Sequence, residues 1–106
     1  MTFIKLSEIE EREVFPMCHV RFVHSENMTF SHWKLEEGAS LPEHSHPHEQ
    51  VCTVIDGELE LTVGGEMRRM PRGLTAIIPS NCPHSAKAIT ECYVIDVFYP
   101  IREDCR

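Results

Sequence analysis

The sequence predicts an all-β barrel on three observations. Seven short segments, many of which alternate apolar with polar side chains, have the period of two that strands with one buried face show. Turn-forming residues separate these segments, and a spacing of about 8–12 residues is typical of a sandwich or small barrel. Closure of the sheet also removes exposed strand edges. The segments cover residues 17–23, 28–35, 50–55, 58–63, 66–70, 74–79 and 92–99.

The turns between the segments are rich in glycine, proline, asparagine and aspartate. Asp56-Gly57 precedes "ELELTV" and Gly64-Gly65 precedes "EMRRM", so we expect two consecutive hairpins here. The one candidate helix, residues 6–13, is weak, and its apolar positions fit an N-terminal arm equally well. We therefore interpret the chain as one domain, with residues 1–27 an arm and strands continuous with the barrel and residues 28–106 the barrel.

Composition narrows the class of function. The 106 residues carry a formal net charge of -7 and no basic stripe, so we expect no nucleic-acid partner. No apolar run approaches the roughly 20 residues of a membrane span, and no signal peptide is visible, so we expect no membrane partner. The five cysteines form no Cys-x-x-Cys pair. This argues against a disulfide framework or a zinc ribbon and favours the reducing cytoplasm.

Three of the seven histidines lie within residues 44–48. Because side chains alternate across a strand, His44, His46 and Gln50 would share one face if the backbone runs on without a bulge. His84, which follows the segment 74–79, is the candidate third imidazole. These four residues would form a neutral ligand set that leaves positions open for water or substrate, and imidazole suits zinc, iron, nickel and copper alike. A solvated histidine-rich loop is the alternative interpretation.

One carboxylate, Asp96, interrupts the last apolar segment. It shares a face with Val94 and Phe98, and we expect the other face, the odd-numbered residues 93–99, to pack in the core. Asp96 would then point into the barrel lumen, where a buried carboxylate needs a cation or an arginine beside it. Arg102 can bind a substrate carboxylate bidentately. The alternatives are an Asp96 on an exposed face, an Arg102 in a solvated tail and a Phe98 that is plain core.

Two motifs resemble those of the cupin superfamily. "G-ASLPE-HSH-PHEQ-VCTVID-G" (residues 38–57) is similar to the first motif, and "G-LTAII-P-SN-CP-H" (residues 73–84) to the second, with 15 residues between them. Asn81 replaces the usual glycine, which asparagine can do because it tolerates left-handed backbone. Gln50 replaces the usual glutamate ligand. The resemblance implies a single cupin barrel, a jelly roll also described as a double-stranded β-helix.

The glutamine and the C-terminal pattern Asp-x-Phe-x-x-x-Arg make the chain similar to the small KdgF-type cupins of pectin and alginate degradation. This resemblance implies that the four-ligand set holds one divalent metal ion, namely zinc, nickel, iron or manganese. It implies catalytic roles for Asp96 and Arg102, and substrate binding by Phe98 and Arg102. The reaction it implies is non-redox: 4,5-unsaturated uronate monosaccharides, which are anionic sugars, become linear 5-keto-4-deoxyuronates.

Two other functions fit three histidines in a barrel. An iron or copper dioxygenase acting on a small aromatic compound or thiol would use the same ligands, with Cys52 or Cys82 nearby. A metal-dependent binding module for a sugar acid would need no catalytic residue. Oxygen consumption distinguishes the first from a non-redox enzyme.

The resemblance to small cupins also implies a homodimer formed by exchange of the N-terminal segment, here Met1–Leu6. Among the remaining histidines, we expect His48 at the rim of the barrel because Pro47 bends the chain. We expect His32 to pack within the lumen.

Overall fold

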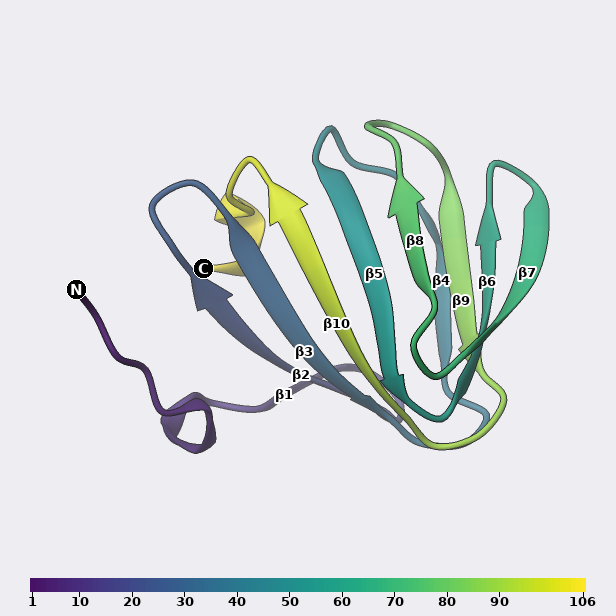
Figure 1. The fold of residues 1–106 in the computed structure, drawn as a ribbon, viewed down its shortest axis with the longest axis horizontal. Coiled ribbons are helices and arrows are strands. Elements are labelled where there is room, and N and C mark those ends of the chain that lie inside the picture. Colours follow the sequence, from purple (N-terminus) through teal and green to yellow (C-terminus); the bar gives the residue numbers. More distant parts are fainter.

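The computed structural model describes residues 1–106 and folds into ten strands in two antiparallel sheets (Figure 1). The six-stranded sheet has the order β1-β2-β3-β10-β5-β8 and the four-stranded sheet the order β4-β9-β6-β7. The two sheets face one another across the core, so the predicted all-β jelly-roll barrel is confirmed. The strands are β1 (Arg12–Phe15), β2 (Cys18–His24), β3 (Thr29–Leu35), β4 (Ser40–His44), β5 (Glu49–Asp56), β6 (Glu58–Val63), β7 (Glu66–Pro71), β8 (Thr75–Ile78), β9 (His84–Ala88) and β10 (Cys92–Tyr99).

The N-terminal residues contain less helix than the sequence pattern allows. A single 3₁₀ turn spans Leu6–Glu8, and a second spans Glu103–Cys105 near the C-terminus. The rest of the candidate helix 6–13 is extended and leads into β1, because pairing with β2 offers its backbone hydrogen bonds that an isolated turn does not. No helix in the structure has the length and apolar character that crossing a membrane requires.

One of the two expected hairpins forms. Gly64-Gly65 joins β6 to β7, with Val63 opposite Glu66. The hairpin expected at Asp56-Gly57 is wrong, because β5 lies in the six-stranded sheet and β6 in the four-stranded one. Gly57 instead carries the chain between sheets with a positive φ, and a Cβ there would collide with the carbonyl oxygen of Glu91.

The core lies between the sheets and is built from alternate residues of each strand. Along β10 the buried residues are Cys92, Val94, Asp96 and Phe98, and the odd-numbered residues 93–99 face outward. The expectation that the odd-numbered face packs in the core was therefore wrong. Both faces of this strand are largely apolar, so alternation alone does not show which of them the opposite sheet covers. Asp96 points inward together with the core residues.

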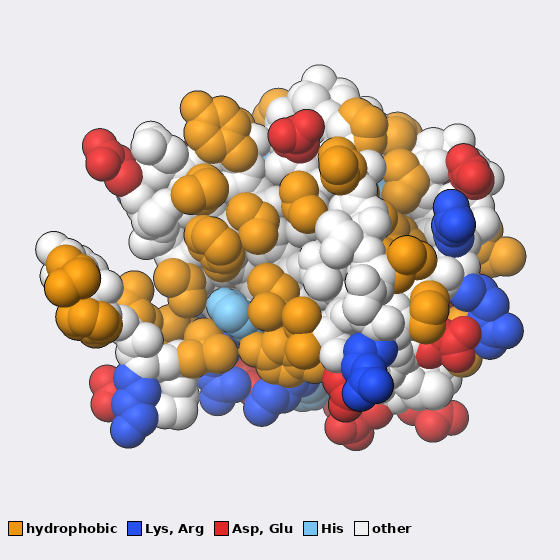
Figure 2. All heavy atoms as spheres, viewed as in Figure 1, with side chains coloured by type: hydrophobic (Ala, Val, Ile, Leu, Met, Phe, Trp, Pro, Cys, Tyr) orange, Lys and Arg blue, Asp and Glu red, His pale blue; other side chains and the backbone are white.

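The outer face of the six-stranded sheet is unusually apolar for a solvent-facing surface. Figure 2 shows hydrophobic side chains gathered over the face that Figure 1 presents, where β3, β10 and β5 lie. Ile55, Ile77 and Tyr99 are exposed there, with 67% of Ile77 accessible. The N-terminal arm extends away from the barrel, and its Phe3 is 85% exposed (Figure 1). Exposed apolar surface is a candidate for contact with a partner, and the expected homodimer stays a prediction.

Candidate metal centre

Four separate elements bring the predicted ligands together. His44 is the last residue of β4 and pairs directly with His84, the first residue of β9. Gln50 lies near the start of β5, in the opposite sheet. His46 lies in the loop between β4 and β5, whereas we expected it on one strand with His44. The strand ends before His46, and the carbonyl of His46 accepts a hydrogen bond of 2.8 Å from the backbone N–H of Asn81.

Asn81 holds this loop because its backbone is left-handed. Its φ is 63°, which confirms the expectation that asparagine takes the conformation of the glycine usual at this motif position. The turn that contains Asn81 therefore fixes both His46, through the hydrogen bond, and His84, three residues further along the chain.

The three imidazoles converge on one point. One ring nitrogen from each of His44, His46 and His84 lies within 4.8 Å of the other two. The ring centroid of His84 is 4.2 Å from that of His44 and 4.9 Å from that of His46. His46, His84 and Gln50 are buried, and His44 is exposed at the edge of the cluster.

Backbone carbonyls determine which nitrogen of each ring faces the centre. The Nδ1 atoms of His44, His46 and His84 lie 2.9, 3.0 and 2.9 Å from the carbonyl oxygens of Pro42, His48 and Cys82. A carbonyl only accepts, so each Nδ1 carries the proton and each Nε2 presents a lone pair. Histidines that bind metals are commonly oriented by such a bond from the second nitrogen.

The polar atoms at the centre lack partners within the protein. Nε2 of His84 is buried and makes no hydrogen bond. Nε2 of His46 lies 3.1 Å from Oε1 of Gln50, and with Nδ1 protonated both of these atoms are acceptors. Two acceptor lone pairs at this distance repel each other, and a cation bound by both would remove the repulsion. The donor set therefore fits a divalent metal, although metal binding itself stays a prediction.

Burial favours the neutral form of the two buried rings, His46 and His84. The pKa of His46 is lowered to about 4, first by burial and then by the charges of Arg102 and His84. Burial also lowers the pKa of His84. Neutral imidazole is the form that binds a metal ion, so these two rings are ready to bind without first releasing protons at neutral pH.

Asp96 lies on β10 between Ser31 of β3 and Cys52 of β5. Its side chain is buried, and its Oδ1 has no hydrogen-bond partner. Burial raises the pKa of Asp96 to about 6, and the polar side chains of Cys52, Gln50 and Trp33 partly oppose this rise. An unsatisfied buried carboxylate is expensive, so its position beside the histidine cluster points to a ligand or an ion.

Arg102 lies over the ring of Phe98, with its guanidinium carbon 4.8 Å from the ring centroid. Its side chain is 14% exposed, so it is not a solvated tail residue. Nε and Nη2 donate to the two carboxylate oxygens of Asp104 at 3.0 and 2.7 Å. This pairing raises the pKa of Arg102 although burial acts in the opposite direction. Its Nη1 makes no hydrogen bond within the chain and can donate to a ligand.

A cavity of ≈ 350 Å³ connects these groups. Six of the seven predicted site residues line it, among them His44, Gln50, His84, Asp96 and Arg102. Phe98 lines it as well, and its ring lies edge-on to that of His46 with centroids 5.5 Å apart. The volume is near the lower end of the range for pockets that bind small molecules, about 300–1,000 Å³.

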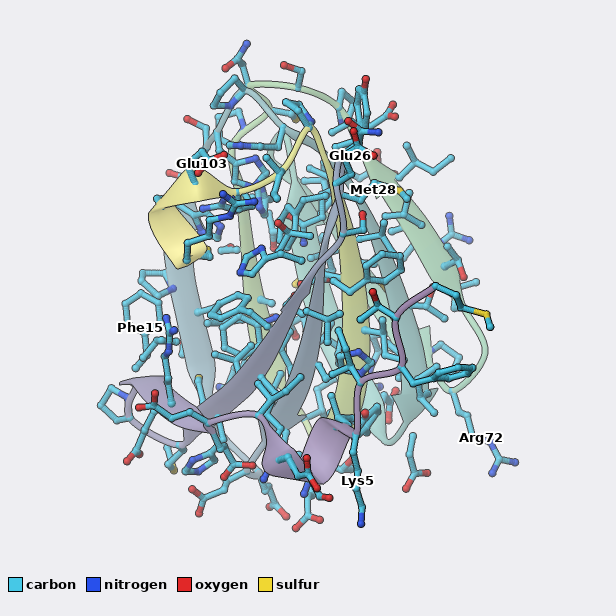
Figure 3. The ribbon with its side chains drawn as sticks, turned by 90° about the vertical axis from the view of Figure 1, so that its left-hand side faces the viewer. Lys5, Phe15, Glu26, Met28, Arg72 and Glu103 are labelled. Atoms are coloured by element: carbon cyan, nitrogen blue, oxygen red, sulfur yellow. The ribbon has the colours of Figure 1, made fainter.

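The sequence did not predict the apolar part of the cavity wall. Val14 and Phe15 of β1, Phe22 of β2 and Leu41 of β4 line it from the open side of the sandwich. Figure 3 shows the molecule from that side, with Phe15 below the turn at Glu103. The only signal in the sequence was the apolar pair Val14-Phe15, which alternation alone does not assign to a site.

Among the remaining predicted positions, His48 and Cys52 lie at the histidine cluster or the cavity, whereas His32 lies away from both. His48 lies beside the cluster, with its ring centroid 5.5 Å from that of His46, but it is not among the converging residues. Cys52 lines the cavity, and burial raises the pKa of its thiol well above the ordinary value. His32 does not face the lumen as expected. It lies on the outer face of β3, where its Nδ1 is 3.0 Å from the hydroxyl of Tyr93.

Comparison with known proteins places this chain in a family. A model of the cupin domain matches residues 31–98. KdgF from Halomonas sp. is 28% identical, with a TM-score of 0.92 over 100% of this chain and 99% of that one. An uncharacterized protein of Streptomyces coelicolor is 28% identical over 102 residues, which are 94% of this chain and 97% of its own length.

Two further structures show the fold alone. An RmlC-like cupin from Shewanella frigidimarina has a TM-score of 0.93 at 24% identity and covers 100% of this chain and 96% of its own. Oxalate decarboxylase from Bacillus subtilis has a TM-score of 0.83 at 23% identity, and the match covers 92% of this chain and 29% of that one. The chain belongs to the cupin domain family, as a small single-domain cupin that resembles KdgF.

Proposed function

We propose that this cupin is a metal-dependent, non-redox enzyme that opens the ring of 4,5-unsaturated uronates to give linear 5-keto-4-deoxyuronates. One observation carries the proposal: a single cavity is lined by His44, His84 and Gln50 of the converging cluster, together with the buried Asp96 carboxylate and the largely buried Arg102 guanidinium. The resemblance to KdgF from Halomonas along the whole chain supports it.

The ligand set fits a divalent ion, as the converging Nε2 atoms and Oε1 of Gln50 indicate. All four ligands are neutral, so a metal bound there would keep its full charge and supply Lewis acidity toward a substrate oxygen. The reaction changes no oxidation state, and zinc, nickel, iron and manganese can all serve.

The chain's own residues would bind the substrate and move its proton. Nη1 of Arg102 is free to bind the uronate carboxylate, and the Phe98 ring beneath the guanidinium offers a wall for the sugar. The anomeric hydroxyl loses its proton, and the bond from the anomeric carbon to the ring oxygen breaks. The ring oxygen becomes the keto oxygen, while carbon 4 gains a proton. Asp96, whose pKa lies near 6, can accept and return that proton close to neutral pH.

Product analysis by NMR tests this proposal. Unsaturated galacturonate and mannuronate are supplied to protein of measured metal content, and the linear keto product is followed. Asp96→Asn and Arg102→Ala should each lower kcat/KM by about 10²–10⁴-fold and retain the metal. Met67→Ser, at an exposed position of β7 in the four-stranded sheet, is the matched control. Wild-type rates in both cavity variants would refute the mechanism.

An oxidative cupin is the second candidate, because much of the cavity wall is apolar and fits a small apolar substrate. An iron- or copper-loaded protein that consumes oxygen with such a substrate would favour this function. A zinc- or nickel-loaded protein that turns over uronate without oxygen uptake would exclude it.

We also propose a cytoplasmic homodimer. All five cysteines are free in the structure, which suits a reducing compartment. The apolar outer face of the six-stranded sheet and the extended apolar arm would be covered by a second copy. A monomer in light scattering would refute the dimer.

A further inference from the structure

Part of the cavity wall is apolar, and the space beside it, here called the apolar compartment, is not used by the proposed uronate reaction. Its wall includes Phe15, Phe22, Leu41, Leu61 and Ala86, none of which offers a side-chain hydrogen bond. A uronate carries several hydroxyl groups, and burying a hydroxyl without a partner costs free energy. A sugar bound at Arg102 therefore gains nothing from this wall.

The compartment exists because a small residue lies between two large ones. Ala86 of β9 pairs with Leu41 on one side and with Leu61 on the other. All three line the cavity, so the missing bulk at Ala86 leaves space between the leucines. Phe22 lines the same cavity from the facing sheet, and Phe15 of β1, which is 41% exposed, lines it as well.

The same cavity is lined by the Arg102 guanidinium, which is paired with Asp104 and keeps one donor for a ligand. The Arg102 side chain is 14% exposed, and its Nη1 is free, since Asp104 occupies only Nε and Nη2. A partly desolvated guanidinium favours a carboxylate. The volume of ≈ 350 Å³ restricts the occupant to a small molecule.

We propose that this cavity binds small monocarboxylic acids with an unbranched apolar body, the carboxylate at Arg102 and the body against Phe22, Leu41 and Ala86. The carboxylate anchor rests on the role proposed above for Arg102, whereas the apolar compartment does not depend on the uronate reaction. Such an acid would compete with any substrate held by Arg102.

Trp33 makes the proposal testable, because it is the only tryptophan and it lines the cavity. Its fluorescence is measured while acetate, butanoate, hexanoate and octanoate are titrated into metal-free and zinc-loaded protein. Transfer of each methylene from water into an apolar site should lower Kd about fourfold until the cavity is full. Arg102→Ala should weaken every acid by a similar factor and leave the dependence on chain length.

Two variants test the wall and one serves as control. Ala86→Phe should fill the compartment and abolish the gain beyond the shortest acids. Phe15→Ser should reduce that gain; because Phe15 is partly exposed, this variant carries the test if Ala86→Phe does not fold. Met67→Ser removes an exposed apolar side chain of β7, outside both the cavity and the outer face of the six-stranded sheet, and should change nothing.

A Kd independent of chain length in the wild-type protein overturns the inference, as does an effect of Met67→Ser equal to that of Phe15→Ser. Uronate turnover, measured on the same preparations, separates this inference from the proposed function. If uronate is turned over but the Kd does not depend on the chain length of the acid, only the apolar compartment is refuted. Dependence on chain length without turnover refutes only the uronate reaction.

Discussion

Replacing Asp96 by asparagine should stabilise the metal-free protein at alkaline pH and not at acidic pH. Burial raises the pKa of the carboxyl from 3.8 to about 6, so between these values the folded state binds more protons than the unfolded state. The contribution of Asp96 to folding stability therefore falls as pH rises from about 4 to about 6. Above that range the folded protein carries a buried anion that costs about 3 kcal/mol. Asparagine has nearly the same shape and no charge to desolvate.

The assay is urea unfolding of metal-free wild type and Asp96→Asn at pH 4 and pH 8. The variant should gain up to about 3 kcal/mol at pH 8 and almost nothing at pH 4. His46, with a pKa lowered to about 4, destabilises the fold as pH falls below 6.5, but equally in both proteins, so it cancels in the difference. Saturating zinc should remove the advantage, because a cation beside Asp96 favours the ionised form. A variant no more stable than wild type at pH 8 without metal would refute this reasoning.

Three other perturbations have defined outcomes. His46→Ala should weaken zinc binding by more than the roughly 100-fold that loss of an outer partner can cause, measured by competition with a chromophoric chelator; unchanged affinity would mean that His46 is not a ligand. Gln50→Glu should retain zinc and lower kcat about tenfold or more, because the added negative charge weakens the Lewis acid; a faster enzyme would contradict this. Deleting residues 1–5 should reduce the mass in light scattering from about twice the chain mass of 12.2 kDa to that of one chain. A deletion variant that is still a dimer would show that these residues are not needed for dimerisation.

Alternation and turn chemistry predicted most of the fold, and they failed where tertiary packing decides. β6 buries Leu59 and Leu61 and leaves Glu58 and Glu60 less buried, as the alternation of its sequence predicts. Asp56-Gly57 has the same local signal as Gly64-Gly65, yet its chain crosses between sheets. A dipeptide sets the turn conformation but not the direction in which the next strand finds its partner. The same limit applies to β10. Both of its faces are largely apolar, so the sequence does not show which face the other sheet covers.

The candidate site was predicted in its polar half and missed in its apolar half. Motif spacing located His44, His46 and His84 although the strand that should carry the first two ends between them. Chemistry-bearing residues are few, so their spacing is informative even when the local backbone is misjudged. Phe15 and Phe22 resemble any core residue in the sequence, and only the space left by Ala86 between two leucines gives them a role.

Gln50 interacts both with the histidine cluster and with Asp96. Its Oε1 is 3.1 Å from Nε2 of His46, on the side of the converging lone pairs. Burial raises the pKa of Asp96, and the same Gln50 side chain opposes part of that rise. A glutamate at this position would place a second carboxylate beside Asp96 in a buried site. Like charges that close raise one of the two pKa values, so one carboxyl would take up a proton. With glutamine, Asp96 is the single titrating carboxyl of the cavity, and its protonation state follows from burial and from the ion beside it.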